Sequence, residues 1–363
     1  MIRIATIGTS PITQDLIEVL QANENGVFVG TLSRNAARAA SFTEEHGGTH
    51  PFSSLEDLAA SDEVDAVYVG SPNALHHDQA LACIAGGKHV LVEKSFCANR
   101  ELAAEVFDAA EAAGVVALEA MRPVHDPALY KLRDEALPQL GRIRRASFHF
   151  GKYSSRYDDI LAGRHTNIFD CAMASGSLMD IGVYTVEPLI ALFGTPEAAF
   201  ATASLLDADT QKLTNGPIDG AGVISVRYPG MIATVEHSKI SVDLSPNQVE
   251  GELGTLTFDG ISTPCNACVH IRGAVHRDSA KGYSGTKTSQ HAIELPSSGN
   301  TMEYELADFI GAVEAVRAGA APAEAPCGGH GSVATFRDIT LNSLALMDEA
   351  RRQTGVAFPA DNR

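Results

Sequence analysis

The sequence predicts a two-domain protein in which a parallel α/β sheet, with helices on both faces, precedes an α+β domain with a large, open, mostly antiparallel sheet. The chain has 363 residues, which exceeds the length of one average domain. Residues 1–121 alternate short apolar runs with helical patterns. Residues 122–363 instead contain longer strand patterns that few helices interrupt. We therefore expect one domain at 1–121 and a second at 122–363.

The first domain is expected to alternate strands and helices. The predicted strands are 2–7, 27–32, 66–69, 89–92 and 115–119, and the predicted helices are 12–21, 36–46, 55–60, 75–85 and 100–113. The strand segments are apolar on both faces, as buried parallel strands are. This order of elements indicates right-handed crossovers over a parallel sheet.

The second domain is expected to be rich in strands. The predicted strands are 146–153, 198–206, 222–228, 231–240 and 254–258, with helices at about 178–192 and 333–352. The Tyr228-Pro-Gly-Met231 segment is a turn signature that joins two of these strands as a hairpin. An open antiparallel sheet leaves one face free, which suggests that subunits pair through it.

Composition and charge exclude several classes of partner. The formal net charge of −18 argues against nucleic acid and against an anionic membrane surface. No run of 18 uninterrupted apolar residues suggests a membrane span, and the first strand begins without a basic region or cleavage site, so we expect a cytoplasmic protein. The Cys265–Cys268 pair has no second pair at zinc spacing, so no metal site is expected.

The turn after the first strand is a candidate dinucleotide site. Such a site brings backbone N–H groups at a helix N-terminus to a pyrophosphate. The candidate residues are Gly8, Thr9, Ser10 and Ile12. Gly8 keeps the first of the three usual glycine places, whereas Ser10 and Thr13 hold the other two. A plain strand–helix turn explains this segment equally well.

The residues that follow the second predicted strand indicate whether NAD(H) or NADP(H) is bound. Enzymes that prefer NAD usually have Asp or Glu there to hold the ribose 2′-hydroxyl. This chain has Ser33 and Arg34 instead, and a hydroxyl and a guanidinium suit a 2′-phosphate. The alternative is a solvated arginine at a helix start. We predict NADP(H) in preference to NAD(H).

Further candidate cofactor contacts follow the third and fourth predicted strands. Ser71, Asn73 and His76 lie at the start of a predicted helix, and Glu93 and Lys94 end the Gly-Lys-His-Val-Leu-Val-Glu-Lys segment. Ligands of open α/β sheets bind beyond the carboxyl ends of the strands, so Glu93 and Lys94 fall where a nicotinamide would lie. Glu93 has the alternative role of bracing this loop.

A second motif, Gly-Ser-Leu-Met-Asp180-Ile-Gly-Val-Tyr184, places Asp180 and Tyr184 four residues apart on one helix face. With the Asn73-to-Lys94 stretch, it resembles the Gfo/Idh/MocA family, named for glucose–fructose oxidoreductase and inositol dehydrogenase. The resemblance covers nearly the whole chain. It implies a Rossmann domain followed by an open-sheet domain, and NAD(P)-dependent oxidation or reduction of sugars, polyols, inositols and related ring alcohols.

The resemblance also implies roles for individual residues. Lys94 matches the family lysine and Asp180 the aspartate of the second motif, while Tyr184 stands where many members have His. A Tyr there resembles glucose–fructose oxidoreductase and the dimeric dihydrodiol dehydrogenases, a branch that favours NADP. Ser95 stands where the family often has Pro. Relatives are commonly dimers or tetramers, which implies a homodimer or homotetramer.

The expected chemistry is hydride transfer between the nicotinamide and a carbon that bears oxygen, with proton exchange at that oxygen. A free Tyr has a pKa of about 10, and a nearby ammonium favours its phenolate and stabilises an oxyanion. We therefore assign Tyr184 as proton donor and acceptor, with Lys94 as its electrostatic partner or as the donor itself. Asp180 holds Lys94 or a substrate hydroxyl. The alternative for Tyr184 is a core phenol.

Arg122 and His165 are further candidates for contact with the substrate, with surface or structural roles as the alternative. The predicted substrate is a sugar, polyol or cyclic diol. Two other functions stay open: a non-catalytic NADP-binding sensor, and a redox-assisted glycosidase of the same fold. The presence of both Lys94 and Tyr184 favours the dehydrogenase or reductase over the sensor.

Overall fold

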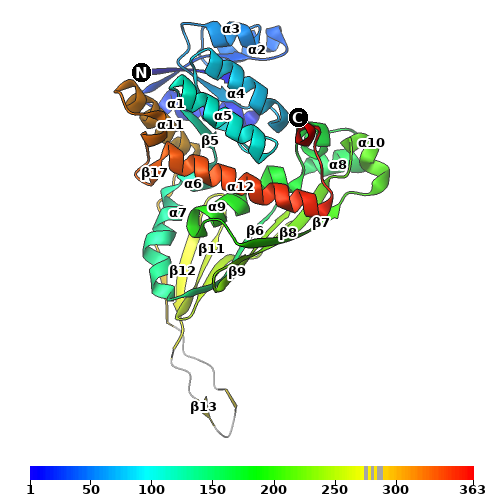
Figure 1. Cartoon of the computed structure of the whole chain (residues 1–363), viewed down its shortest axis with the longest axis vertical. Coiled ribbons are helices and arrows are strands. Elements are labelled where there is room, and N and C mark those ends of the chain that lie inside the picture. Colours follow the sequence, from blue (N-terminus) through cyan, green and yellow to red (C-terminus); the bar gives the residue numbers. More distant parts are fainter. Residues whose placement is uncertain (274–276, 279–281, 284–288) are drawn as a thin grey trace.

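The computed structural model describes residues 1–273, 277–278, 282–283 and 289–363, and it contains both predicted sheets (Figure 1). The first sheet has the strand order β2-β1-β3-β4-β5, and every neighbouring pair is parallel. Its elements are β1 (Ile2–Ile7), α1 (Pro11–Ala22), β2 (Gly26–Leu32), α2 (Ala36–Glu45), α3 (Leu55–Ala60), β3 (Ala66–Val69), α4 (His76–Ala85), β4 (His89–Glu93), α5 (Arg100–Ala113) and β5 (Ala117–Ala120). The predicted parallel α/β architecture is confirmed.

The turn between β1 and α1 requires a glycine at position 8. Gly8 has φ +111°, a conformation that side chains with a Cβ rarely adopt. A Cβ at Gly8 would also come within 2.7 Å of the Gly70 carbonyl oxygen at the end of β3. Glycine therefore lets the β1 and β3 ends approach each other at the carboxyl edge of the sheet.

The second sheet has eight strands in the order β15-β12-β11-β10-β6-β9-β8-β7, and only the β6–β9 pair among its described strands is parallel. Its strands are β6 (Ile143–Gly151), β7 (Ala198–Leu205), β8 (Asp219–Tyr228), β9 (Met231–Ser238), β10 (Asn247–Gly251), β11 (Gly254–Asp259), β12 (Cys265–Ile271) and β15 (Ser289–Ile293). Tyr228 pairs with Met231 at the β8–β9 turn, so the predicted hairpin is confirmed. The mostly antiparallel sheet is confirmed as well.

Helices cover one face of the second sheet. The remaining elements are α6 (Arg122–His125), α7 (Pro127–Lys131), α8 (Ser155–Leu161), α9 (Val183–Phe193), α10 (Gln211–Thr214), α11 (Met302–Arg317), α12 (Val333–Thr354) and the two-residue strands β13 (Arg277–Asp278), β14 (Gly282–Tyr283), β16 (Pro326–Cys327) and β17 (Gly331–Ser332). Apolar side chains of alternate strand positions, such as Phe148, Val235 and Leu256, are buried on the helix-covered face. We call the opposite face, which carries Phe200 and Ile232, the outer face.

Two C-terminal helices join the two sheets. Helix α12 packs against α9 and β7 of the second domain and also against α5 and β5 of the first, and Figure 1 shows it running between them. Helix α11 packs against α1 and α6. The chain beyond residue 122 therefore contributes to the core around the first sheet as well as to the second.

The predicted helix at 178–192 begins differently from the expectation. Leu178–Gly182 forms a wider π-helical turn, and the regular helix α9 follows it at Val183. The whole helical stretch Cys171–Phe193 is long and apolar enough to cross a membrane by length and composition, yet 78% of its most apolar window is buried inside the fold. That burial is typical of the core helix of a globular domain.

Candidate active site

A cavity of about 650 Å³ lies where the carboxyl ends of β1, β3 and β4 face the second domain. Both domains contribute to its wall, in the position where open α/β sheets bind ligands. The lining residues are Ser10, Ile12, Gly70, Ser71, Pro72, Asn73, Glu93, Lys94, Arg156, Asp159, His165, Thr166, Asn167, Ile168, Met173, Ser175, Asp180 and Tyr184. The cavity thus brings together residues from both sequence motifs.

The N-terminus of α1 opens onto this cavity. Ser10 caps the helix by accepting a hydrogen bond from the backbone N–H of Thr13 at 3.3 Å, and the two hydroxyls lie 3.0 Å apart. Ser10 and Ile12 line the cavity. A helix N-terminus with hydroxyl groups beside it suits a phosphate group, so these residues fit the pyrophosphate of a dinucleotide.

The end of β2 presents an exposed arginine. The backbone N–H of Asn35 donates to Ser33 Oγ at 3.4 Å, and the Asn35 side chain caps α2. Arg34 is exposed and forms no ion pair within the described part of the chain. A guanidinium without a carboxylate partner fits a ribose 2′-phosphate.

Lys94 lies at the centre of the polar contacts in the cavity. Its Nζ donates to the Asp180 backbone carbonyl at 2.7 Å and to Asp180 Oδ1 at 2.9 Å. The other carboxylate oxygen of Asp180 accepts from Nζ of Lys239, which follows β9. Asp180 therefore lies between two ammonium groups. The peptide bond between Lys94 and Ser95 is cis.

The neighbouring charges fix the protonation of Lys94 and of Asp180. Burial alone would lower the pKa of Lys94, but the charges of Asp180, Tyr184 and Glu93 outweigh burial and raise it above its ordinary value. Burial would raise the pKa of Asp180, but the ammonium groups of Lys94 and Lys239 hold it well below its ordinary range. Lys94 is therefore an ammonium and Asp180 a carboxylate at neutral pH.

Tyr184 is held between cations in the wall of the cavity. Lys94 Nζ lies 5.1 Å from the centroid of its ring, and Arg122 Nη2 lies 3.5 Å from its hydroxyl oxygen. Phe150 packs edge-on against the ring, with 5.4 Å between centroids. Lys94, Arg122 and Tyr184 thus converge on one point, although they come from three separate segments of the chain.

Glu93 is buried next to Lys94. Its Oε1 accepts a hydrogen bond from the Tyr68 hydroxyl at 2.6 Å, and its Oε2 accepts from the backbone N–H of Lys94 at 3.2 Å. Burial raises the pKa of Glu93 above its ordinary value. This carboxyl group braces the loop and also lines the cavity.

The other predicted cofactor contacts fall into two groups. Ser71 and Asn73 line the cavity; Ser71 Oγ donates to Gln79 at 2.6 Å, and Asn73 Nδ2 donates to the Ala174 carbonyl at 2.9 Å. His76 is fully buried behind the wall instead. Its Nε2 lies 2.7 Å from the Ser71 carbonyl oxygen and its Nδ1 lies 3.0 Å from that of Ser95. His76 therefore ties together the two loops that line the cavity.

The part of the cavity that residues 156–168 line, which we call the far end, carries several polar side chains. His165, predicted as a substrate contact, lines it and places Nε2 2.8 Å from Asp170 Oδ2. Arg156 and Asp159 of α8 also line it and form an ion pair at 3.5 Å. Donors and acceptors at this end suit a ligand that carries several hydroxyl groups.

Sequence reasoning missed Lys239, Arg156 and Asp159. A signal for Lys239 was present: Ala233, Val235 and His237 mark the buried face of β9, and Lys239 continues the same alternation. A lysine at an inward position is rare unless it is paired. For Arg156 and Asp159 the local sequence is that of an ordinary exposed helix.

Comparison with known proteins identifies the family. Residues 2–120 match the model described as the oxidoreductase family with an NAD-binding Rossmann fold, and residues 138–257 match the GFO/IDH/MocA C-terminal domain. The chain belongs to the Gfo/Idh/MocA family. The predicted family is therefore confirmed.

One relative resembles this chain over nearly its full length and another over about three quarters of it. The chain is 36% identical to scyllo-inositol 2-dehydrogenase (NADP(+)) IolU of Bacillus subtilis, with 99% of both chains covered. It is 27% identical to trans-1,2-dihydrobenzene-1,2-diol dehydrogenase of Macaca fascicularis, over 73% of this chain and 75% of that protein.

A solved structure shows the same fold. KijD10, a 3-ketoreductase from Actinomadura kijaniata crystallised with NADP and TDP-benzene, has a TM-score of 0.78 at 22% identity, with 97% of this chain and 98% of that chain covered. The predicted fold class is confirmed, and the relatives support the prediction of an NADP-dependent oxidoreductase.

Proposed function

We propose that this protein is an NADP(H)-dependent oxidoreductase that interconverts a secondary alcohol and a carbonyl group on a sugar, polyol or cyclic diol. The observation that carries the proposal is the convergence of Lys94, Asp180 and Tyr184 on one wall of the cavity, with Arg122 Nη2 3.5 Å from the Tyr184 hydroxyl although Arg122 itself does not line the cavity. The same cavity reaches the N-terminus of α1, where a dinucleotide fits.

The cofactor would be held by this chain's own residues. Ser10 and Ile12 at the start of α1 would hold the pyrophosphate, Ser33 and Arg34 the 2′-phosphate, and Ser71, Asn73 and Glu93 the nicotinamide end. When bound, the nicotinamide supplies the carbon that accepts or donates a hydride.

The remaining chemistry belongs to Lys94 and Tyr184. An ammonium has three N–H donors, and two of those on Lys94 are engaged by Asp180, so the third is available to the substrate oxygen. Lys94 thereby stabilises negative charge on that oxygen. Because its raised pKa keeps it an ammonium, Lys94 acts as the electrostatic partner, and the Tyr184 hydroxyl exchanges the proton.

Two observations favour a cyclic polyol such as an inositol as the substrate class. The far end of the cavity offers Arg156, Asp159, His165 and Asn167, whose polar groups would suit a ligand with several hydroxyls. The relative with 36% identity over the full length is named for scyllo-inositol and NADP(+).

A turnover screen tests the proposal. NADP+ is incubated with the purified protein and with inositols, aldoses, linear polyols or cyclic diols, and NADPH formation is followed by absorbance. We expect turnover with at least one cyclic polyol and a higher kcat/KM with NADP+ than with NAD+. Absence of turnover across all four classes, with NADPH bound normally, would contradict the proposal and favour a sensor.

We further propose a homodimer or homotetramer assembled through the outer face of the eight-stranded sheet. Phe200 and Ile232 project from that face with 68% and 57% of their surfaces exposed. Large apolar side chains on an open sheet are typical of a subunit interface. Light scattering on a Phe200→Asp, Ile232→Asp variant is expected to show a smaller assembly than the wild type, and an unchanged mass would exclude this interface.

A cytoplasmic location is also part of the proposal. It is supported by the six cysteines, all of which are free thiols, as is usual in a reducing compartment. Fractionation of cells that produce the protein tests it. Recovery outside the cytoplasmic fraction would contradict this location.

A further inference from the structure

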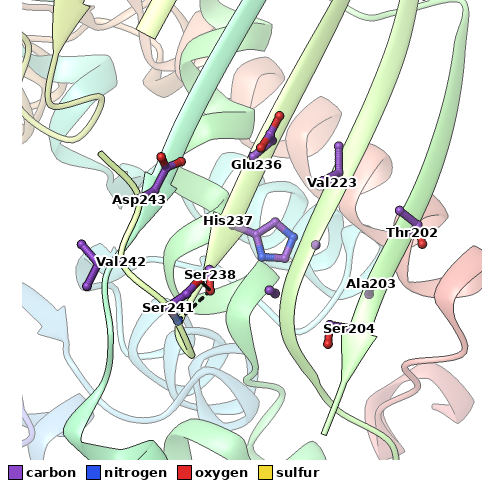
Figure 2. Close-up of a pocket in the computed structure, with 12 residues that line it drawn as sticks. Thr202, Ala203, Ser204, Val223, Glu236, His237, Ser238, Ser241, Val242 and Asp243 are labelled. Atoms are coloured by element: carbon purple, nitrogen blue, oxygen red, sulfur yellow. Dashed lines mark hydrogen bonds between the residues drawn. The ribbon is translucent and has the colours of Figure 1, made fainter. Parts of the chain in front are cut away.

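A second hollow, of about 540 Å³, lies on the second sheet, and strands β7, β8 and β9 and the segment after β9 line it (Figure 2). Small residues of β7 and β8, among them Ala203, Ala221 and Gly222, leave this space open. Glu236 and Asp243 lie at its edge, on β9 and on the following segment. None of its lining residues belongs to the catalytic cavity.

Three side chains meet beside this hollow because of how the strands pair. His149 of β6 stands directly opposite Glu236 of β9 in the parallel ladder, so both side chains project from the outer face. The backbone N–H of Asp243 donates to the Gly151 carbonyl at 3.1 Å. A Cβ at Gly151 would lie 2.5 Å from the Asp243 Cβ, so only glycine lets this segment close on β6.

The resulting cluster has negative charge without a matching cation. His149 Nδ1 lies 3.2 Å from Asp243 Oδ2 and 3.7 Å from Glu236 Oε2. Within the described ranges, neither carboxylate forms an ion pair with a lysine or an arginine. Two carboxylates thus face one imidazole nitrogen, and a cation between them would relieve their repulsion.

The imidazole is oriented toward the gap between the carboxylates. Nδ1 is shut off from solvent and forms no hydrogen bond, and 12% of the His149 side chain is exposed. On the other side of the ring, Nε2 lies 3.0 Å from Ser147 Oγ, which in turn lies 2.9 Å from Thr234 Oγ1. A proton on Nε2 donated to Ser147 leaves the Nδ1 lone pair free, and metal-binding histidines are held in this way.

The distances suit a metal ion. Ligand atoms bound tetrahedrally at about 2.0–2.2 Å from zinc are separated by roughly 3.3–3.6 Å. The two separations from His149 Nδ1, 3.2 and 3.7 Å, bracket that range, and all three ligand atoms lie within 4.8 Å of one another. An imidazole with two carboxylates is a donor set for zinc and similar divalent transition metals rather than for Mg²⁺ or Ca²⁺.

We propose that His149, Glu236 and Asp243 form a binding site for one divalent transition-metal ion of the zinc type, with an open coordination position facing the hollow. This site was not expected from the sequence, because His149 lies more than 80 residues before Glu236 and Asp243 and the expected absence of metal rested on cysteine spacing. The site lies on the same face as Phe200 and Ile232, beside the proposed subunit interface. It is independent of the proposed catalytic function.

Calorimetric titration of the chelator-treated, assembled protein with Zn²⁺ tests the site. We expect one Zn²⁺ per chain, affinity at least tenfold lower in His149→Gln and in Asp243→Asn, and Mg²⁺ bound at least tenfold more weakly than Zn²⁺. Glu250→Gln is the matched control, because Glu250 lies on the same face but pairs with Arg145 at 3.5 Å. Cys265→Ser with Cys268→Ser controls for zinc bound by thiols.

Control measurements of folding and of cofactor affinity accompany the titration. Circular dichroism and NADPH affinity are expected to be unchanged in all the variants, since none of these residues lines the catalytic cavity. No saturable Zn²⁺ binding would overturn the proposal. Binding that persists in both His149→Gln and Asp243→Asn, or that disappears in the cysteine variant, would overturn it as well.

Discussion

Replacing Asp180 with Asn removes the carboxylate that Lys94 and Lys239 share. The side chain keeps its size, and the hydrogen bond from Lys94 to the backbone carbonyl of residue 180 can remain. Two neighbouring ammonium groups are then left without a counter-charge. Because their side chains are 15% and 8% exposed, water relieves little of this repulsion.

The magnitude follows from the geometry. At an effective dielectric constant of about 20, unit charges as close as Lys94 Nζ and Asp180 Oδ1, 2.9 Å apart, attract by roughly 6 kcal/mol. Desolvation offsets part of this attraction, and removing one partner of a buried pair costs about 3–5 kcal/mol. We expect Asp180→Asn to lower the free energy of unfolding by about that amount at pH 7.

The pH dependence has a defined sign. Asp180 has a lowered pKa in the folded protein, so its contribution is present above the ordinary carboxyl range and is lost as acid protonates it. The raised pKa of Lys94 makes its contribution complete at neutral pH and lost only in strong alkali. The difference between wild type and variant is therefore largest near neutrality and shrinks below about pH 4.

Catalysis gives a second measure of the same change. Without Asp180, burial lowers the pKa of Lys94, so the alkaline limb of the kcat/KM profile is expected to move to lower pH and kcat/KM at pH 7 to fall roughly 10²–10³-fold. Urea unfolding and a pH–rate profile measure the two effects. Asp134→Asn is the control, since Asp134 pairs with Arg133 on the surface and its loss is expected to cost less than about 1 kcal/mol. An alkaline limb that superimposes on that of the wild type, with stability changed no more than in the control, would refute the reasoning.

Three further predictions concern the proton relay, the cofactor and a buried carboxyl. Tyr184→Phe is expected to lower kcat by roughly 10²–10⁴-fold with NADPH affinity unchanged, measured by single turnover and fluorescence titration; a full kcat would remove Tyr184 from the relay. Arg34→Ala is expected to weaken NADPH binding by about tenfold or more and to leave NADH binding unchanged, and equal losses for both would refute a 2′-phosphate contact. Burial raises the pKa of Asp219 to about 6, so the wild type gains stability as pH falls from about 6 to 4, whereas Asp219→Asn lacks this gain. Unfolding curves at pH 7 and pH 4.5 compare the two proteins, and parallel changes with pH would contradict this assignment.

The fold was largely predictable because the strands of the first sheet are short, apolar runs between helical patterns. β10 was missed because its five residues are mostly polar, with only Asn247 and Val249 fully buried. β12 was missed because its CxxC segment was considered as a possible zinc site and not as a strand. The predicted boundary at residue 121 stays a prediction, and α12 packs against elements on both sides of it.

The candidate site was predictable where its chemistry lies in compact motifs. Lys94, Asp180 and Tyr184 each belong to one, and the structure places all three on the same cavity wall. Lys239 reaches Asp180 only because the end of β9 packs against the π-helical turn, a contact between segments that local patterns do not report. His76 was expected at the cofactor because it lies at the start of a predicted helix beyond the carboxyl end of a strand, yet its ring is used to hold two loops together.

Transfer of a labelled hydride tests the central claim most directly. A cyclic polyol deuterated at its carbinol carbons is incubated with NADP+ and enzyme, and the deuterium content of the NADPH is measured by mass spectrometry. The proposed function predicts one deuterium per NADPH formed by the wild type, and no labelled NADPH from a Lys94→Met variant that still binds the cofactor. Undeuterated NADPH from the wild type, or full labelling by Lys94→Met, would contradict it.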